Sequence, residues 1–218
     1  FRSLNDDATV SEHGFVSWYR EGDGAGVVWL DGRDEAIDSP EAASGEPAGT
    51  SLRYATLTAS GRVIEQGVVD SLVCDCCRTD VASTRAGAAV VYRDRSAQEI
   101  RDIAVRVHTP SGWSDPARLG PDHWQIAGCP INGPALDASG NDIVAAWFTA
   151  ADGRGHVRMA RSSDAGVSFA PPVEIDNGGA YGQVSVVLSE DGTAFVSWWR
   201  RAQDGAELAV RSVTGDGK

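Results

Sequence analysis

The residues whose types and spacing most directly suggest chemistry are the four cysteines of this chain. They are Cys74, Cys76, Cys77 and Cys129. Clustered thiols pair as disulfides in an oxidising compartment, or they hold a soft metal such as copper or zinc with His123 or Asp75 as a further ligand. Because no second C-x-x-C follows, the spacing is not that of a zinc finger. The sequence leaves disulfides and a metal site open as alternatives.

Four aromatic-centred strands recur along the chain and must position these cysteines. Their aromatic residues are Trp29, Tyr92, Trp147 and Trp198, at intervals of 63, 55 and 51 residues. Each strand is flanked by further alternating segments, and the turns between them are rich in Gly, Asp and Ser. Intervals of this length are typical of four-stranded blades, and no segment carries a helical apolar period. The sequence therefore predicts an all-β chain that folds as a β-propeller of about four blades.

The chain is long enough for one large domain, and its 25 Gly and 7 Trp suit turns and radially packed sheets. We expect a single β-propeller domain over residues 1–218. Its expected blades cover roughly 13–70, 79–120, 132–176 and 182–218.

One segment has the spacing of a known structural motif. Residues 161–169 read Arg-Ser-Ser-Asp-Ala-Gly-Val-Ser-Phe, which resembles the Asp box of sialidase-like β-propellers. The resemblance implies a turn between the two outer strands of a blade, in which the Asp164 carboxylate accepts backbone N–H bonds. It also implies that Gly166 takes a conformation closed to other residues, that Phe169 points inward, and that Ser162 completes the motif. Asp boxes hold blades together and lie away from active sites.

Three further segments extend the resemblance over nearly the whole chain. They are Cys-Asp-Cys-Cys-Arg-Thr-Asp-Val (74–81), Val-Tyr-Arg-Asp-Arg-Ser with Glu-Ile-Arg-Asp-Ile (91–103), and Cys-Pro-Ile-Asn-Gly-Pro-Ala-Leu (129–136). Together they resemble a group of bacterial exported proteins described as sialidase-like or BNR-repeat proteins, a resemblance that brings no established activity. Because sialidase-like propellers have six blades, we expect the chain to be part of a six-bladed propeller located in the periplasm or outside the cell. The alternative is a closed ring of four blades, completed by the N-terminal segment.

Blade geometry assigns the polar residues to faces. The loops between second and third strands and the connections between blades emerge on one face, which we call the loop face, and the Asp-box turn emerges on the other. Ligands bind propellers mostly at loops of this kind. The ligand-binding residues expected there are Asp75, Asp80, Arg93, Arg101, His123, Trp124, Asn132 and Arg201.

The resemblance also implies candidates for sialidase chemistry. True sialidases use a Tyr nucleophile backed by a Glu, an Asp acid/base, and three Arg that bind the substrate carboxylate bidentately. The catalytic candidates in this chain are Arg33, Arg95, Asp94, Glu99 and Tyr181, with Arg201 as a third Arg. The family's Phe/Tyr-Arg-Ile-Pro motif is absent from the sequence, so no complete catalytic set is assigned.

Charge excludes two classes of partner. The net charge is −12, from 31 acidic and 19 basic side chains, and this charge repels nucleic acids and anionic membranes. No apolar run is long enough for a membrane-spanning helix. The sequence gives no indication of the oligomeric state.

We therefore expect a propeller that binds a glycan or another small ligand on its loop face, with exo-sialidase-type glycoside hydrolysis left open. Two alternatives come from other classes. One is a non-enzymatic periplasmic protein that binds copper or zinc through its cysteines, and the other is a propeller that serves as a protein-interaction platform.

Overall fold

The computed structural model describes residues 3–5, 7, 9–35, 49–120 and 122–215. Sixteen β-strands make up the fold, and the only helical element in these residues is the 3-10 helix η1 (Arg33–Glu35). This confirms the predicted all-β class. No helix in the described part of the chain has the length and apolar character needed to cross a membrane.

The strands form four antiparallel sheets in chain order, each of them one blade. Blade 1 contains β1 (His13–Glu21), β2 (Gly24–Asp31), β3 (Ser51–Leu57) and β4 (Val63–Asp70). Blade 2 contains β5 (Asp80–Ser83), β6 (Ala88–Arg93), β7 (Ile103–Thr109), β8 (Gly112–Trp113) and β9 (Ala117–Arg118). Blade 3 contains β10 (Ala135–Ser139), β11 (Asp142–Thr149), β12 (His156–Ser162) and β13 (Val173–Glu174). Blade 4 contains β14 (Ala180–Leu188), β15 (Ala194–Ala202) and β16 (Gly205–Val213).

Apolar residues that alternate along the strands form one core between each pair of neighbouring blades. Val28 and Tyr92 lie in the core between blades 1 and 2, and Trp147 lies in the core between blades 2 and 3. Strand β11 is buried on both faces because blade 2 covers one face and blade 4 the other. Strand β11 is therefore an almost continuous run of apolar residues. Strand β14, in contrast, alternates between buried and exposed residues.

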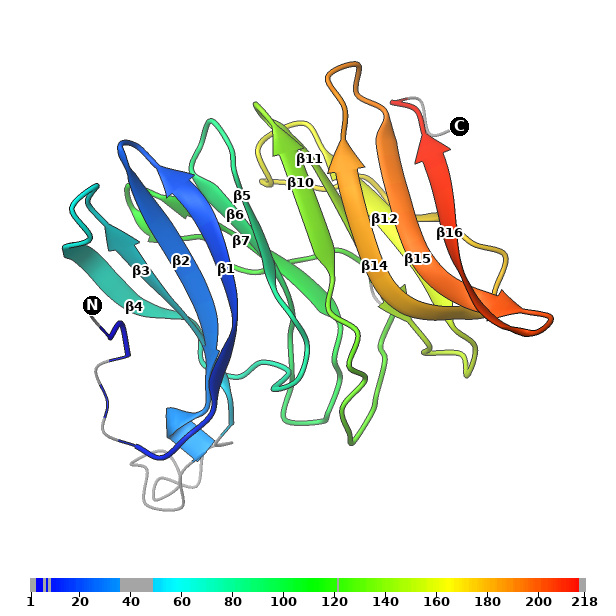
Figure 1. The fold of residues 1–218 in the computed structure, drawn as a ribbon, viewed down its shortest axis with the longest axis horizontal. Helices are drawn as coiled ribbons and strands as arrows, with labels where there is room; N and C mark the ends of the chain where they lie inside the picture. Colours follow the sequence, from blue (N-terminus) through cyan, green and yellow to red (C-terminus); the bar gives the residue numbers. More distant parts are fainter. Residues whose placement is uncertain (1–2, 6, 8, 36–48, 121, 216–218) are drawn as a thin grey trace.

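The four blades stand in a row, with blades 1 and 4 at opposite ends (Figure 1). Their first strands, β1, β5, β10 and β14, contact one another in that order. The N-terminal residue Leu4 packs against Val27 and Trp29 of blade 1. The described N-terminal residues therefore add no strand to blade 4, which argues against a closed ring of four.

The loops separate into two sets, as the alternating direction of the strands requires. The β4–β5 and β6–β7 connections and the described parts of the β2–β3 and β9–β10 connections lie along the lower edge in Figure 1, and the β1–β2 and β14–β15 turns lie along the upper edge. The lower edge is the loop face.

The turn after β12 is held together by hydrogen bonds to one carboxylate, that of Asp164. The Asp164 carboxylate accepts hydrogen bonds from Ser168 N at 2.9 Å and from the Ser162 hydroxyl at 2.7 Å. Gly166 has a φ of 90°, a value that favours glycine. Phe169 is partly buried against the core between blades 2 and 3. The backbone N–H of Ala165 donates to the carbonyl of Asn141 in the β10–β11 turn, so this motif lies on the face opposite the loop face.

Candidate ligand site at the meeting of three loops

Three loops of blades 2 and 3 are held together at the loop face. They span residues 71–79, 94–102 and 119–134. Backbone hydrogen bonds join the first loop to the second strand of blade 2, with Cys74 N donating to Arg93 O at 2.9 Å. Arg101 N donates to Trp124 O at 2.9 Å and so joins the second loop to the third. The three segments that the resemblance singled out therefore meet at one place in the fold.

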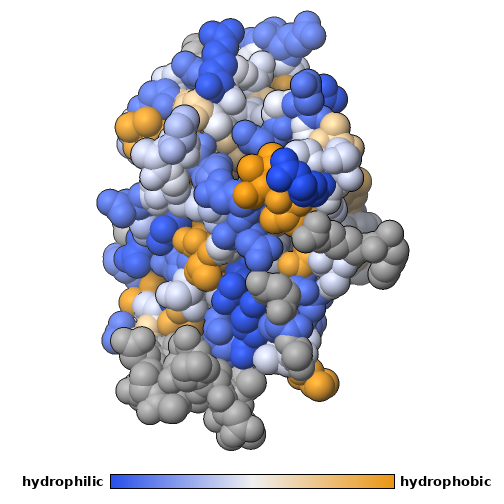
Figure 2. All heavy atoms as spheres, turned by 90° about the vertical axis from the view of Figure 1, so that its left-hand side faces the viewer, coloured by the Kyte–Doolittle hydropathy of each residue, from blue (hydrophilic) through white to orange (hydrophobic). Residues whose placement is uncertain are grey.

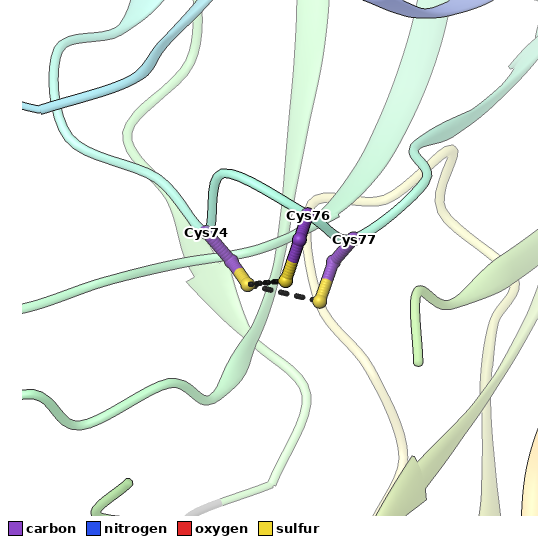
Figure 3. A group of neighbouring side chains, drawn as sticks. All are labelled: Cys74, Cys76 and Cys77. Atoms are coloured by element: carbon purple, nitrogen blue, oxygen red, sulfur yellow. Dashed lines mark hydrogen bonds between the residues drawn. The ribbon is translucent and has the colours of Figure 1, made fainter. Parts of the chain in front are cut away.

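A disulfide between Cys76 and Cys129 joins the loops that lead into blades 2 and 3, with a Cα–Cα distance of 6.0 Å. Cys74 and Cys77 are free and buried, and their Sγ atoms lie 2.9 Å apart. Cys74 Sγ also lies 3.8 Å from Cys76 Sγ, so the three sulfurs form one cluster (Figure 3). Contact with Cys77 lowers the pKa of Cys74, whereas contact with Cys74 and burial raise the pKa of Cys77.

The donor set does not fit a metal site in this oxidation state. The Sγ atoms of Cys74, Cys76 and Cys77 lie within 4.8 Å of one another. However, the sulfur of Cys76 belongs to a disulfide, as does that of Cys129, so neither offers a thiolate. His123 is exposed and does not belong to this group. The described residues thus provide two thiols, where soft-metal sites in proteins combine more thiolates or imidazoles.

Arg93 is buried, with 2% of its surface exposed, and its guanidinium binds main-chain carbonyls. It donates to Asn132 O at 2.8 and 3.1 Å, to Arg101 O at 2.6 Å and to Phe148 O at 2.8 Å. Its guanidinium carbon lies 4.9 Å from the ring centre of Trp124, which is also buried. Burial lowers the pKa of Arg93. Arg93 and Trp124 are therefore buried side chains that hold the loops in place and do not face solvent.

Arg95 and Arg101 both bind one carboxylate, that of Glu99. Arg95 donates to Glu99 Oε1 at 2.7 Å, and Arg101 donates to Glu99 Oε2 at 2.8 Å. Arg101 also donates to Asp75 at 3.1 Å and to Cys74 Sγ at 3.3 Å. Burial alone would lower the pKa of Arg101, but these anionic partners outweigh it and raise the pKa. The hydrogen bonds from Arg95 and Arg101 lower the pKa of Glu99, which stays ionised.

The side chains of Arg95 and Glu99 are 24% and 27% exposed, whereas that of Arg101 is 5% exposed. A ligand can therefore reach the Arg95 guanidinium directly, whereas the Arg101 guanidinium lies behind it and is almost fully buried. Asp75, 44% exposed at its side chain, lies at the outer end of the same network.

Two predicted acidic residues are placed away from this network. Burial, followed by the nearby charge of Asp70, raises the pKa of Asp94, whose carboxylate lies 3.4 Å from Arg118. Burial also raises the pKa of Asp80, whose carboxylate accepts bonds from the backbone N–H groups of Leu136 at 3.0 Å and Val81 at 2.9 Å. Asp80 thus joins the first strand of blade 2 to that of blade 3.

Asn132 is buried and connects the third loop to blade 4. Its side chain accepts a hydrogen bond from Gln183 N at 2.9 Å and donates to Tyr181 O at 3.2 Å. A Cβ at Gly182 would overlap the Asn132 side-chain oxygen, which is why glycine stands there. The Tyr181 ring is 45% exposed, and the Arg201 guanidinium lies 5.8 Å from its centre.

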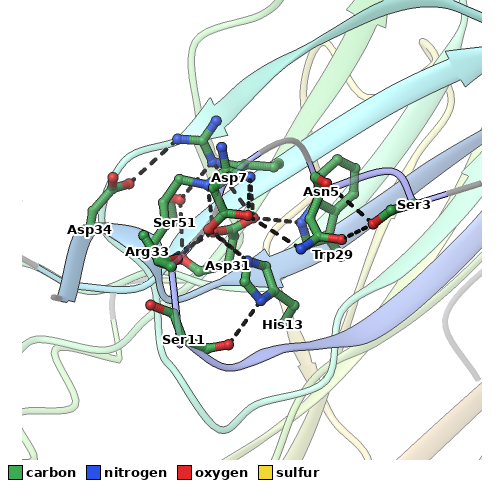
Figure 4. Close-up of polar contacts among 12 residues, drawn as sticks. Ser3, Asn5, Asp7, Ser11, His13, Trp29, Asp31, Arg33, Asp34 and Ser51 are labelled. Carbon is green, nitrogen blue, oxygen red and sulfur yellow. Dashed lines mark hydrogen bonds and ion pairs between the residues drawn. The ribbon is translucent and has the colours of Figure 1, made fainter.

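Arg33, Arg95 and Arg201, the three candidates for a carboxylate clamp, come from three different blades and have different partners. Arg33 binds Asp31 within blade 1, with Nε at 2.8 Å from the carboxylate (Figure 4). Arg95 binds Glu99 in blade 2, and Arg201 lies beside Tyr181 in blade 4. Each of these arginines therefore has its partner within its own blade.

The cluster around Asp31 was missed by the sequence analysis. Asp31 is fully buried and accepts bonds from Trp29 Nε1 at 2.8 Å and from Arg33, and His13 Nε2 lies 3.4 Å from it (Figure 4). The only sequence signal for it is the alternation of Trp29, Asp31 and Arg33 on successive odd positions. Because Arg33 and Arg53 already face this carboxylate, the group forms an ion-pair cluster that fixes the end of β2.

Strained backbone concentrates at the loop face. Among the residues that the structure describes, six other than glycine have positive φ, and four of them lie there. They are Glu99 at 60°, His123 at 50°, Ile131 at 51° and Gln183 at 54°. A positive φ is a genuine outlier for a β-branched residue such as Ile131. Strain of this kind persists where surrounding structure enforces it and clusters at functional sites. His123 is held by the bond from its backbone N–H to Asp102, at 3.1 Å.

No known family model matches the chain, and no curated protein sequence matches it. Solved structures match its fold. A protein of unknown function from Dyadobacter fermentans is 14% identical with a TM-score of 0.61, over 95% of this chain and 67% of that one. A family 117 glycoside hydrolase from Zobellia galactanivorans is 13% identical with a TM-score of 0.53, over 98% and 69%. The Trypanosoma rangeli sialidase in complex with sialic acid is 10% identical with a TM-score of 0.54, over 94% and 36%.

At these identities the likeness is one of fold, and the chain has a β-propeller fold of four-stranded blades like those of glycoside hydrolases. It spans about two thirds of the first two structures and about a third of the sialidase chain. The number of blades in a complete propeller stays a prediction.

Proposed function

We propose that this chain is a glycan-binding β-propeller whose loop face recognises an acidic carbohydrate through Arg95 and Arg101. The observation that carries the proposal is the convergence of both guanidinium groups on one partly exposed carboxylate, that of Glu99. A sugar carboxylate that takes the place of the Glu99 carboxylate would meet a pair of arginines already arranged to bind it.

Two further observations support a ligand at this place. The strained residues Glu99, His123 and Ile131 border the same loops, and strain is retained mostly where function requires it. The fold neighbours include a glycoside hydrolase and a sialidase described with sialic acid bound, which supports a carbohydrate as the ligand class.

We propose binding rather than turnover as the primary function. Glu99 faces Arg95 and Arg101, whereas Asp94 lies against Arg118. Among the described residues, no hydrogen bond joins the Tyr181 hydroxyl to Glu99. Hydrolysis by the sialidase route needs that pair together with an acid at the scissile bond. A fluorogenic sialoside assay tests this directly. If the protein hydrolyses the sialoside and Glu99→Gln abolishes this activity, the site is an active site and the proposal of binding alone is wrong.

The test of binding compares acidic and neutral oligosaccharides by isothermal titration calorimetry. We expect sialylated or uronic-acid oligosaccharides to bind and their neutral counterparts to bind at least about tenfold more weakly. Arg95→Ala and Arg101→Ala should each weaken acidic binding by about 10- to 100-fold, the loss typical of one charge-assisted bidentate contact.

Arg154→Ala is the matched control, because Arg154 lies in the β11–β12 loop of the same face and is 77% exposed at its side chain. This variant removes the same charge but should leave affinity unchanged. Equal losses in all three variants would show that only net charge matters, and equal binding of neutral and acidic glycans would contradict the proposal.

We also infer that residues 161–169 are an Asp box of the sialidase-like, BNR-repeat class and that the protein is exported by a bacterium. The bonds around Asp164 and the Cys76–Cys129 disulfide support these inferences, since disulfides persist mainly in oxidising compartments. Cell fractionation of the producing organism checks the location.

A further inference from the structure

The four cysteines lie at the centre of the loop face, and the ligand site proposed above requires none of their sulfur atoms. Cys74 Sγ lies 2.9 Å from Cys77 Sγ and 3.8 Å from Cys76 Sγ, which is bonded to Cys129. One thiol is thus in contact with a second thiol and with a disulfide at the same time. A structural disulfide needs no such neighbours.

We propose that these residues form a thiol–disulfide exchange centre, in which the Cys74/Cys77 dithiol and the Cys76–Cys129 disulfide interconvert and Cys129 meets external reagents. Burial determines which of the four cysteines external reagents can reach. Cys74 and Cys77 are 1% and 0% exposed, Cys76 is half-buried, and Cys129 is exposed. External thiols and disulfides, whether small molecules or cysteines of another protein, therefore reach the bridge most readily from the Cys129 side.

The first step transfers the bridge inward. Cys74 Sγ, as a thiolate, attacks Cys76 Sγ; the Cys74–Cys76 bond forms, the Cys76–Cys129 bond breaks, and Cys129 leaves as a thiolate. The proton that Cys74 gave up is matched by the one that Cys129 takes up. No external oxidant or reductant is needed.

The second step completes the exchange within the buried pair. Cys77 loses its proton and attacks Cys74 Sγ; the Cys74–Cys77 bond forms, the Cys74–Cys76 bond breaks, and Cys76 takes up the proton. In total two electrons and two protons move from Cys74 and Cys77 to Cys76 and Cys129. A low-molecular-weight disulfide such as oxidised glutathione can then reoxidise Cys76 and Cys129, and is itself reduced to two thiols.

Two arginines favour the thiolates that these steps require. Arg101 donates from Nη1 to Cys74 Sγ at 3.3 Å, and the positive charge of the buried Arg93 favours the thiolate form of Cys77. Thiolates, not thiols, are the attacking species, and neighbouring cations stabilise them. The positive groups thus lie beside the two sulfurs that attack.

Tryptic mapping under non-reducing conditions distinguishes the two bridges. Cleavage after arginine yields one peptide, 63–78, that carries Cys74, Cys76 and Cys77, and another, 119–154, that carries Cys129. The Cys76–Cys129 bridge links these two peptides, whereas the Cys74–Cys77 bridge leaves them separate.

The native protein is incubated in graded mixtures of reduced and oxidised glutathione with a chelator present, quenched with N-ethylmaleimide and mapped by mass spectrometry. We expect the protein molecules that carry one disulfide to include both forms, one with the two peptides linked and one with the two peptides separate. Alkylation of Cys74 and Cys77 in every mixture, with only the linked form present, would overturn the proposal. So would exchange that occurs in parallel mixtures without the chelator and not in those that contain it.

Two matched variants give a second readout. Cys77→Ser lacks the resolving sulfur, so exchange should stop at Cys74–Cys76 and release Cys129 for alkylation. Cys74→Ser lacks the attacking sulfur and should keep the linked form. We expect Cys129 labelling to be about tenfold higher in Cys77→Ser than in Cys74→Ser; equal labelling would contradict the proposal. Because the mapping above uses native protein, a folding defect in either variant leaves that test intact.

Discussion

Burial divides the polar residues of the loop face into two groups with different roles. Arg93 and Asn132 are inside and bind the main chain of neighbouring loops. Arg95 and Glu99 are at the surface and bind each other. The first group determines where the loops lie, and the second remains within reach of a ligand.

Asp94 provides a test of how burial acts on one carboxyl group. Because burial raises its pKa above the unfolded value of 3.8, the folded state binds the proton more tightly, and stability falls as pH rises through the folded pKa. Asp94→Asn removes this cost and keeps an oxygen for Arg95 N, which now donates to Asp94 at 2.8 Å. The Tm at pH 7 should therefore rise, by about 2 to 4 °C for each kcal/mol, and the difference should vanish below pH 3.8.

Thermal unfolding followed by circular dichroism from pH 3 to 8 measures this difference. Asp115→Asn, at an exposed position, is the control for replacing an aspartate by asparagine away from the buried site. A lower Tm for Asp94→Asn at pH 7 would mean that the ion pair with Arg118 outweighs the cost of burial.

At the scale of elements, single side chains join strands and loops of different blades. Arg93, at the end of β6, reaches the third loop and the end of β11. Asp80, at the start of β5, holds the start of β10. These bonds fix the angle between blades 2 and 3. The loops of the candidate site belong to these two blades.

Replacing Arg93 tests this role. Arg93→Ala leaves three buried carbonyl groups without their donor, so we expect the free energy of unfolding in urea to fall by about 3 to 5 kcal/mol. Arg93→Lys keeps the charge but lacks the planar set of donors and should recover only part of the loss. Arg20→Lys on the exposed side of β1 is the control and should change stability by under about 0.5 kcal/mol. A loss under about 1 kcal/mol for Arg93→Ala would contradict the role.

At the scale of the whole molecule, the outward faces of the two end blades are apolar. In blade 4, Trp199 and Leu208 are cross-strand partners and are 44% and 60% exposed, and Val210 is 62% exposed. In blade 1, Trp18 and Ile64 are 57% and 63% exposed. Figure 2, which views the blade 1 end, shows apolar patches among hydrophilic surface. Inner blades bury the equivalent faces against their neighbours.

We expect these faces to make the chain self-associate, because contiguous exposed apolar surface favours burial against another molecule. Sedimentation velocity should show a weight-average mass that rises with protein concentration. The double variant Leu208→Lys and Val210→Lys should reduce this rise, whereas Ser189→Lys, in the β14–β15 turn, should not. A monomer at every concentration would contradict the expectation.

Much of the fold follows from local sequence patterns. Alternating apolar residues and turn residues such as Gly192 act over a few positions, so they place strands and hairpins without tertiary contacts. The alternating direction of the strands then assigns the loops around Cys74, Arg95 and Cys129 to one face. The all-β class and the propeller of four-stranded blades were therefore predictable, whereas the roles of the loop-face residues stay predictions.

Only the tertiary structure decided which of those residues are buried and which partners they have. Cys129 pairs with Cys76, 53 positions away, rather than with either of its neighbours in the cluster. Arg93 binds the carbonyl of Asn132, 39 positions away, and is thereby removed from solvent. Such contacts depend on how blades pack against each other, and the residue types that bind a ligand are the same types that hold loops together. Sequence spacing alone cannot separate these two roles, whereas burial and distance do.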